Sequence, residues 1–326
     1  MTNTDIDYSR HLLGIEHLSR EELYNYLDNA THFLEVSERD LKKVPALRGK
    51  TVVNLFLEPS TRTRTSFEIA GKRLSADTIN MTASGSSVSK GETLLDTART
   101  IAAMNPDVLV IRHRASGAAH FLASRLENTA VINAGDGMHE HPTQALLDLL
   151  TLRQHFKDRS GGIEGLRVAI VGDIRHSRVA RSNIMAHLLL GNKVRLVGPS
   201  TLIPDLLVKE NCFGEPLQVF YRLEEGIEGC DVIMLLRMQL ERSAGGFIPS
   251  LEEYAREYCL TSKIVERYAG DAVVMHPGPI NRGIEISGEL ADSPRSLIEK
   301  QVTSGVAVRM AVLFKLATAS GEEKRE

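Results

Sequence analysis

The stretch FLEPSTRTRTSFE at residues 56–68 decides how the first half of this chain folds. The preceding segment 51–55, TVVNL, is short, β-branched and mostly apolar, which predicts a buried strand. Apolar residues after the stretch recur at the spacing of one helix face. Pro59 ends the strand, and Ser60 is a good N-cap for a helix. The sequence therefore predicts a strand that runs directly into a helix whose first turn is Ser-Thr-Arg-Thr-Arg.

This helix start is suited to binding an anion. Its first turn offers free backbone N–H groups, the positive end of the helix dipole, hydroxyl groups and the guanidinium groups of Arg62 and Arg64. Together they fit a dianion such as phosphate. The alternative is a solvated, basic helix start, but clustered arginines oppose the dipole at a helix N-terminus unless an anion is bound there.

Strands and helices alternate along the rest of the chain. This order predicts two α/β domains, each with a largely parallel sheet flanked by helices. We place the first domain at residues 1–150 and the second at 151–299, with a C-terminal helix at about 300–320 packing back on the first. Polar groups follow the ends of several predicted strands, which predicts an active site in the cleft between the domains. The further predicted strands are 77–81, 107–111, 129–133, 167–171, 193–197, 217–220, 231–236 and 272–275.

Composition narrows the class of protein. The 326 residues are 42% hydrophobic and 25% charged, which suits a globular protein of about two domains. A net charge of −3 and the lack of a basic tail argue against nucleic acid as a partner. No apolar run approaches the ~20 residues that a membrane span needs, and no signal peptide is evident. Cys212, Cys230 and Cys259 are too widely spaced for a zinc knuckle, and their odd number argues against a disulfide framework; they predict buried thiols in a reducing cytoplasm.

The Ser-Thr-Arg-Thr-Arg turn after a strand resembles the carbamoyl-phosphate site of the carbamoyltransferases, a family that includes aspartate and ornithine enzymes. Three further motifs occur in the family's order: HPTQ at 141–144, LRMQ at 236–239 and HPGP at 276–279. The resemblance covers roughly residues 8–320. Gly172-Asp173 follows a predicted strand and precedes a predicted helix, which would suit a dinucleotide site. We reject that interpretation because the G-x-G-x-x-G fingerprint is absent there.

The resemblance implies that the first domain binds carbamoyl phosphate. Arg112 would reach both the phosphate and the carbamoyl oxygen, which His141 would polarise with the help of Thr63. Gln144 would bind the carbamoyl nitrogen. On their own, Arg112 could be a solvated strand end and His141 a capping or surface histidine. The implied carbamoyl-phosphate ligands are Ser60, Thr61, Arg62, Thr63, Ser86, Lys90, Arg112, His141, Gln144, Gly278 and Pro279, the last two through backbone carbonyls.

The second domain would bind the amine substrate. Arginines near two strand ends suit a dicarboxylate better than a diamino acid, which favours the aspartate branch of the family over the ornithine branch. The ornithine branch also typically has His-Cys-Leu-Pro where this chain has His-Pro-Gly-Pro. The alternative for these arginines is surface salt bridges. The implied aspartate ligands are Lys90, Arg178, Arg237 and Gln239.

The implied reaction moves the carbamoyl group of carbamoyl phosphate to the amino group of L-aspartate, giving N-carbamoyl-L-aspartate and phosphate for pyrimidine synthesis. No cofactor and no metal is implied, so catalysis would come from positioning and charge stabilisation. The polar loop at 82–92 crosses into a neighbouring subunit in the family, which implies a homotrimer with shared sites. Regulatory or dihydroorotase chains are further partners in the family. Two alternatives stay open: another amine such as ornithine, or an inactive binding subunit. The implied catalytic residues are Arg62, Thr63, Lys90, Arg112 and His141.

Overall fold

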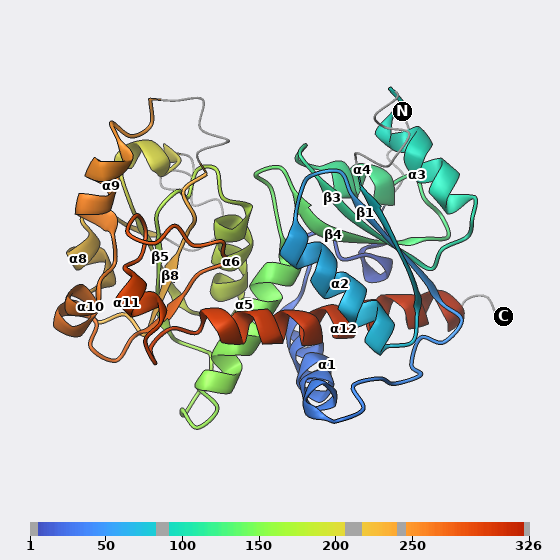
Figure 1. Cartoon of the computed structure of the whole chain (residues 1–326), viewed down its shortest axis with the longest axis horizontal. Helices are drawn as coiled ribbons and strands as arrows, with labels where there is room; N and C mark the ends of the chain where they lie inside the picture. The colour runs from blue at the N-terminus through green and yellow to red at the C-terminus, as the bar shows by residue number, and fades with distance from the viewer. Residues whose placement is uncertain (1–5, 83–90, 206–216, 240–245, 323–326) are drawn as a thin grey trace. The chain divides into compact units, whose positions relative to one another are not determined.

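The computed structural model describes residues 6–82, 91–205, 217–239 and 246–322 (Figure 1). The chain divides into two compact units. Unit 1 comprises the described parts of Met1–Leu150 and Thr303–Glu326, and unit 2 those of Thr151–Val302. Each unit is an α/β structure with its own parallel sheet, which confirms the predicted fold class. Ser86, Lys90 and Cys212 lie outside the described residues.

The sheet of unit 1 has four strands in the order β2-β1-β3-β4, and every pairing is parallel. The two central strands are buried because they consist mainly of Val, Leu and Ile, whereas β2 is an edge strand with exposed side chains. Residues Leu12 and Ile132 form a parallel bridge, so the N-terminal segment pairs with β4 at the opposite edge. The strands are β1 (Thr51–Phe56), β2 (Asp77–Thr82), β3 (Val108–His113) and β4 (Ala130–Asp136).

Helices connect these parallel strands, as parallel pairing requires. Helix α1, which precedes β1, begins with a capping box at Ser19, since the Ser19 hydroxyl accepts from the Glu22 backbone and the Glu22 carboxylate accepts from the Ser19 backbone. Residues of α3, α4 and three strands share one apolar core cluster, which includes Leu55, Leu109 and Leu122. The helical elements of unit 1 are η1 (Tyr8–Arg10), α1 (Arg20–Glu38), α2 (Thr61–Arg73), α3 (Leu94–Ala102), α4 (Ala118–Ala123) and parts of α5 (Pro142–His155) and α12 (Ile298–Glu322).

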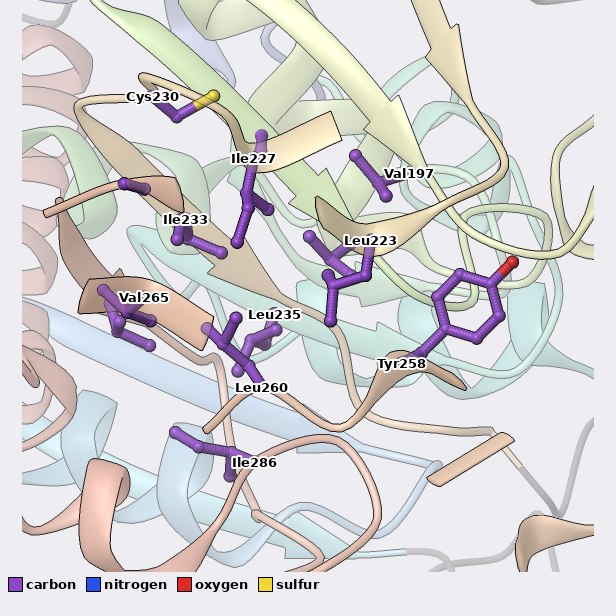
Figure 2. Close-up of a cluster of buried hydrophobic side chains, with 14 of the residues drawn as sticks. Val197, Leu223, Ile227, Cys230, Ile233, Leu235, Tyr258, Leu260, Val265 and Ile286 are labelled. Atoms are coloured by element: carbon purple, nitrogen blue, oxygen red, sulfur yellow. The ribbon is translucent and has the colours of Figure 1, made fainter. Parts of the chain in front are cut away.

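The sheet of unit 2 has five parallel strands in the order β7-β6-β5-β8-β9. Figure 2 shows its core, in which Ile233 and Leu235 from a central strand lie among Leu223, Ile227 and Leu260. The strands are β5 (Arg167–Val171), β6 (Lys193–Val197), β7 (Gln218–Phe220), β8 (Val232–Leu235) and β9 (Val273–Met275). The helical elements between and after them are α6 (Arg178–Leu189), η4 (Ser200–Leu202), α8 (Leu223–Ile227), α9 (Leu251–Tyr258), α10 (Ser262–Tyr268) and α11 (Gly288–Ala291).

The long C-terminal helix corrects one expectation from composition. Residues 298–319 of α12 are long and apolar enough to cross a membrane, although no such run was expected. In this structure 61% of that segment's most apolar window is buried. Its side chains include Met310, Leu313 and Leu316, which are fully buried. We therefore interpret α12 as a core helix.

A histidine is buried completely inside unit 2. His187 lies on α6 with no exposed surface, and the Asn192 side-chain amide donates to its Nδ1 at 2.9 Å. The Asn192 side-chain oxygen in turn accepts from the Leu166 backbone at 2.8 Å, which fixes the amide. Burial lowers the pKa of His187 from 6.5 to about 4, because the imidazolium would lose its hydration.

This histidine should make the protein less stable in mild acid. Between pH 6.5 and about 4 the unfolded chain binds a proton at His187 that the folded chain does not, so stability falls as the pH falls. Lowering the pH from 7 to 5 should therefore reduce the free energy of unfolding by about 2 kcal/mol through His187 alone. A His187→Leu variant should lose less unfolding free energy over that range in urea titrations, even if it is less stable at both pH values. The control is His32→Leu, which replaces an exposed histidine on α1. If His187→Leu loses as much unfolding free energy between pH 7 and pH 5 as the wild type, His187 is not the cause of the acid sensitivity.

Candidate active site

The N-terminus of α2, the predicted anion site, lies directly after the central strand β1. Ser60 is the N-cap residue, with extended backbone angles of φ −161° and ψ 98°, yet its side chain makes no capping hydrogen bond. By contrast, the N-caps Ser19, Ser177 and Ser250 each accept from their helices. The first turn of α2 therefore keeps backbone N–H groups that an anion can satisfy. Its Arg62 is exposed, and Thr63 is 8% exposed.

Arg112 lies beside this turn. It is paired with Phe56 in the sheet register, and its carbonyl accepts from the Leu57 backbone at 2.9 Å. Its guanidinium donates from Nη2 to Glu58 Oε1 at 2.9 Å and from Nη1 to the Ala134 carbonyl at 3.1 Å. The Arg112 side chain is only 11% exposed, so the interpretation as a solvated strand end is wrong. Glu58, which sequence analysis did not single out, holds the guanidinium next to the Ser60 turn.

His141 and Gln144 lie at the start of α5, at the same edge of the sheet as the end of β4. Both are buried, with exposures of 4% and 8%. The Gln144 side-chain nitrogen donates to Asp148 Oδ1 at 2.9 Å. Because a carboxylate only accepts, this bond assigns the amide orientation and makes the Gln144 oxygen the atom that can accept from a ligand N–H. That is the role expected of an amide beside a carbamoyl nitrogen.

A buried arginine on α12 links this end of α5 to α2. Arg309 Nη1 donates to Ser66 Oγ on α2 at 3.0 Å, and the guanidinium lies 5.3 Å from the centre of the Phe67 ring. Burial lowers the pKa of Arg309 to about 10, and the nearby Asp148 carboxylate opposes that shift. Asp148 and Arg309 thus support the Gln144 amide and helix α2, respectively. The i, i+4 spacing of Gln144 and Asp148 was a usable signal in the sequence.

In unit 2 the predicted carboxylate ligands follow strand ends. Arg178 is the first residue of α6 and only 5% exposed, so the interpretation as a surface salt bridge does not fit it. Arg237 and Gln239 follow β8 and are half-buried. The turn between β5 and α6 needs Gly172, whose φ is +122° and whose hypothetical Cβ would lie 3.3 Å from the Leu236 carbonyl.

The turn after β9 is fixed by a buried histidine. The Gly278 backbone donates to His276 Nδ1 at 2.7 Å, so in the neutral imidazole Nε2 carries the hydrogen and donates to Glu285 Oε1 at 3.1 Å. The same Glu285 oxygen accepts from the Asn281 backbone at 2.8 Å. The peptide between Gly278 and Pro279 is cis. These contacts hold the backbone whose carbonyls are the predicted substrate acceptors.

The predicted ligands thus form two sets. The turn at Ser60–Thr63, Arg112, His141 and Gln144 belong to unit 1, and Arg178, Arg237, Gln239, Gly278 and Pro279 belong to unit 2. Each set lies at the carboxyl edge of its own sheet, where open parallel sheets bind ligands. The roles of these residues, and the cleft expected between the domains, stay predictions.

Comparison with known families matches both units. Residues 10–154 match the carbamoyl-P binding domain of aspartate/ornithine carbamoyltransferase, and residues 164–316 match its Asp/Orn binding domain. The chain belongs to the aspartate/ornithine carbamoyltransferase family. The fold and the order of motifs in this carbamoyltransferase are those of the family.

Individual relatives indicate which branch of the family the chain is most similar to. The chain is 57% identical to the aspartate carbamoyltransferase catalytic subunit of Syntrophus aciditrophicus, over 95% of this chain and 97% of the relative. Among solved structures, the catalytic subunit of M. jannaschii aspartate transcarbamoylase has a TM-score of 0.83 at 35% identity, covering 96% of this chain and 99% of the other. The Trypanosoma cruzi aspartate transcarbamoylase in complex with aspartate and phosphate has a TM-score of 0.82 at 28% identity, covering 94% and 96%.

Removing one guanidinium should weaken phosphate binding at α2. A charge-assisted hydrogen bond contributes ~1.5–3 kcal/mol, so Arg62→Ala should raise the dissociation constant for inorganic phosphate roughly 10- to 150-fold in equilibrium dialysis. The control is Lys72→Ala, which removes a charge of the same sign from the last turn of the same helix. Equal phosphate affinity in the two variants would place the anion site elsewhere.

Proposed function

We propose that this chain is the catalytic subunit of an aspartate carbamoyltransferase, which transfers the carbamoyl group of carbamoyl phosphate to L-aspartate. The observation that carries the proposal is the 57% identity, over nearly the whole chain, to a protein of that name. The products are N-carbamoyl-L-aspartate and phosphate, and the reaction belongs to pyrimidine synthesis. The geometry of both units supports this chemistry.

Carbamoyl phosphate binds in unit 1 with its phosphate on the first turn of α2. The uncapped N–H groups and Arg62 receive its charge, while Arg112, held by Glu58, reaches from the phosphate to the carbamoyl oxygen. His141 and Thr63 donate to the same oxygen, and the Gln144 oxygen accepts from the carbamoyl nitrogen. These donors stabilise the negative charge that develops on the oxygen as the carbonyl carbon becomes tetrahedral.

Aspartate binds in unit 2 through its carboxylates. Arg178, Arg237 and Gln239 supply the donors, and the carbonyls of Gly278 and Pro279 accept from N–H groups of the substrates. The α-amino group of aspartate attacks the carbamoyl carbon, a C–N bond forms, and the C–O bond to phosphate breaks with its electron pair. The departing phosphate takes the proton that the amine loses. These residues act by positioning and by charge, and the reaction needs no covalent intermediate on the protein.

The proposal also covers the assembly of the protein, its partner chains and its location in the cell. The match of Ser86 and Lys90 to the family's loop supports a homotrimer in which each loop completes a neighbour's site. Relatives carry the name catalytic subunit, which supports a regulatory or dihydroorotase chain as a further partner. Cys230 and Cys259 are free thiols, which agrees with a cytoplasmic location.

The first test of the proposed function is the choice of amine. Aspartate should be carbamoylated in a ureido-product assay with carbamoyl phosphate, and ornithine should not, because the arginines of unit 2 repel a second ammonium group. Arg237→Ala should raise the KM for aspartate at least ~10-fold. Arg222→Ala, an exposed arginine of the same unit paired with Glu225, is the control. Turnover of ornithine equal to that of aspartate would reject the aspartate assignment.

The second test addresses shared sites. Arg62→Ala and Lys90→Ala should each be nearly inactive alone. In a mixed trimer some interfaces join an intact Ser60–Thr63 turn to an intact Lys90 loop, so co-refolding the two variants should restore a minor but measurable share of activity. If mixed trimers form and no activity returns, Lys90 serves its own subunit.

A further inference from the structure

Three histidines and a glutamate converge in unit 1, on side chains that the proposed reaction does not use. Glu16 and His17 lie just before α1, His120 lies on α4, and His139 lies in the turn between β4 and α5. Glu16 Oε1 is 3.1 Å from His17 Nε2, 3.7 Å from His139 Nε2 and 3.8 Å from His120 Nε2. His17 Nε2 is 3.1 Å from His120 Nε2. One carboxylate oxygen therefore faces the Nε2 atoms of three imidazoles.

These separations fit a tetrahedral metal ion. Zinc binds imidazole nitrogen and carboxylate oxygen at about 2.0–2.2 Å, which places neighbouring ligand atoms of a tetrahedron about 3.4 Å apart. The Glu16–His17, Glu16–His120 and His17–His120 separations, from 3.1 to 3.8 Å, bracket that value, and the ligand atoms of these three residues lie within 4.8 Å of one another. His139 Nε2 is 3.7 Å from Glu16 Oε1 but forms no common group with His17, so its ring would have to move toward His17 and His120 to become the fourth ligand.

Hydrogen bonds alone satisfy the pair of His17 and His120 poorly, whereas His139 faces a carboxylate at each ring nitrogen, Asp136 at Nδ1 and Glu16 at Nε2. The Nε2 atoms of His17 and His120 face each other at 3.1 Å, so one must donate and the other must accept. If His17 donates, its single hydrogen is shared between His120 and Glu16. If His120 donates, the lone pair of His17 Nε2 faces the Glu16 carboxylate at 3.1 Å. A cation at the centre removes the conflict, because all three Nε2 lone pairs and the carboxylate oxygen can then point at it.

The surroundings hold the rings as metal sites usually do. His139 Nδ1 lies 3.2 Å from Asp136 Oδ2, so a carboxylate orients the ring from behind, as in carboxylate–histidine–zinc sites. Asp136 is 1% exposed and accepts from the Gly117 backbone at 2.6 Å and from the Asn133 side chain at 2.8 Å. The ring of His17 packs against the Tyr8 ring in a tilted arrangement, with centroids 3.8 Å apart and an interplanar angle of 32°.

The site is accessible and its donors match one class of ion. The side chains of the four converging residues are 20–41% exposed, so an ion can enter from solvent. Three imidazole nitrogens with one carboxylate oxygen suit zinc and its neighbours rather than Mg²⁺ or Ca²⁺, which prefer oxygen ligands. The sequence by itself indicates no metal site, because these four residues come from three separated segments and form no spaced motif.

We propose that Glu16, His17, His120 and His139 bind one divalent transition-metal ion, best matched by Zn²⁺. Bound metal would tie the segment before α1 and helix α4 to the turn that ends at His141. The site is separate from the predicted substrate ligands, and the proposal does not depend on the proposed function.

The experiment uses the full chain, stripped of metal with a chelator and titrated with Co²⁺. Wild type should bind one Co²⁺ per chain and show the intense visible d–d bands of a tetrahedral ion. Zn²⁺ should displace it with one equivalent by mass-spectrometric metal analysis. His17→Ala and His120→Ala should each weaken Co²⁺ binding at least ~10-fold, and Asp136→Asn should weaken it ~10- to 100-fold while keeping the bands. His32→Ala, on the exposed face of α1, should bind as wild type does, and circular dichroism confirms folding of each variant.

Three results would overturn the proposal. One is the absence of tetrahedral bands in the folded wild-type protein. Another is equal Co²⁺ affinity in wild type, His17→Ala and His120→Ala. The third is a sulfur-to-cobalt charge-transfer band, which would show that the ion is held by cysteine instead.

Discussion

Parallel pairing of β1 with β3, and of β3 with β4, determines where the functional side chains of unit 1 can lie. Parallel strands end at one edge, so the turn after β1, the end of β3 and the turn after β4 meet there. The register places Phe56 opposite Arg112, and the Arg112 guanidinium then reaches the carbonyl of Ala134 on β4. The sheet thus aligns an uncapped helix N-terminus, a guanidinium and a buried imidazole without any long-range loop.

Two buried charged residues, Asp148 and Arg309, hold the elements that carry the predicted ligands of unit 1. Asp148 and Arg309 are both almost inaccessible, and removing either would leave the other charge in a low-dielectric interior. Such pairs contribute little net stability compared with apolar packing, and in this structure their geometry is what matters. Asp148 holds the Gln144 amide, and Arg309 holds Ser66 one helical turn beyond Ser60–Thr63. Rotation of either α2 or α5 would break one of these bonds.

Much of this arrangement could be predicted from the sequence because its signals are local. The strands are runs of β-branched and apolar residues, and the positions of Pro59 and Ser60 mark the start of α2 within one residue. The sequence did not predict that the Ser60 hydroxyl leaves its helix uncapped, because that depends on backbone angles. The contacts of Glu58, Arg309 and the histidine cluster join residues far apart in the chain, and no periodicity reports such contacts. The apolar character of α12 was underestimated because charged residues interrupt its runs.

The bridge between Leu12 and Ile132 makes the two edges of the unit 1 sheet unequal. Backbone groups of the N-terminal segment occupy the outer side of β4, with Leu12 donating to Val131 at 3.0 Å and Asn133 donating to Leu12 at 2.9 Å. The outer backbone groups of Val131 and Asn133 are therefore already paired. At the other edge β2 carries exposed side chains, among them Ile79 at 49% exposure. Strand-to-strand association that extends this sheet, whether in assembly or in aggregation, is consequently favoured next to β2 over the paired middle of β4.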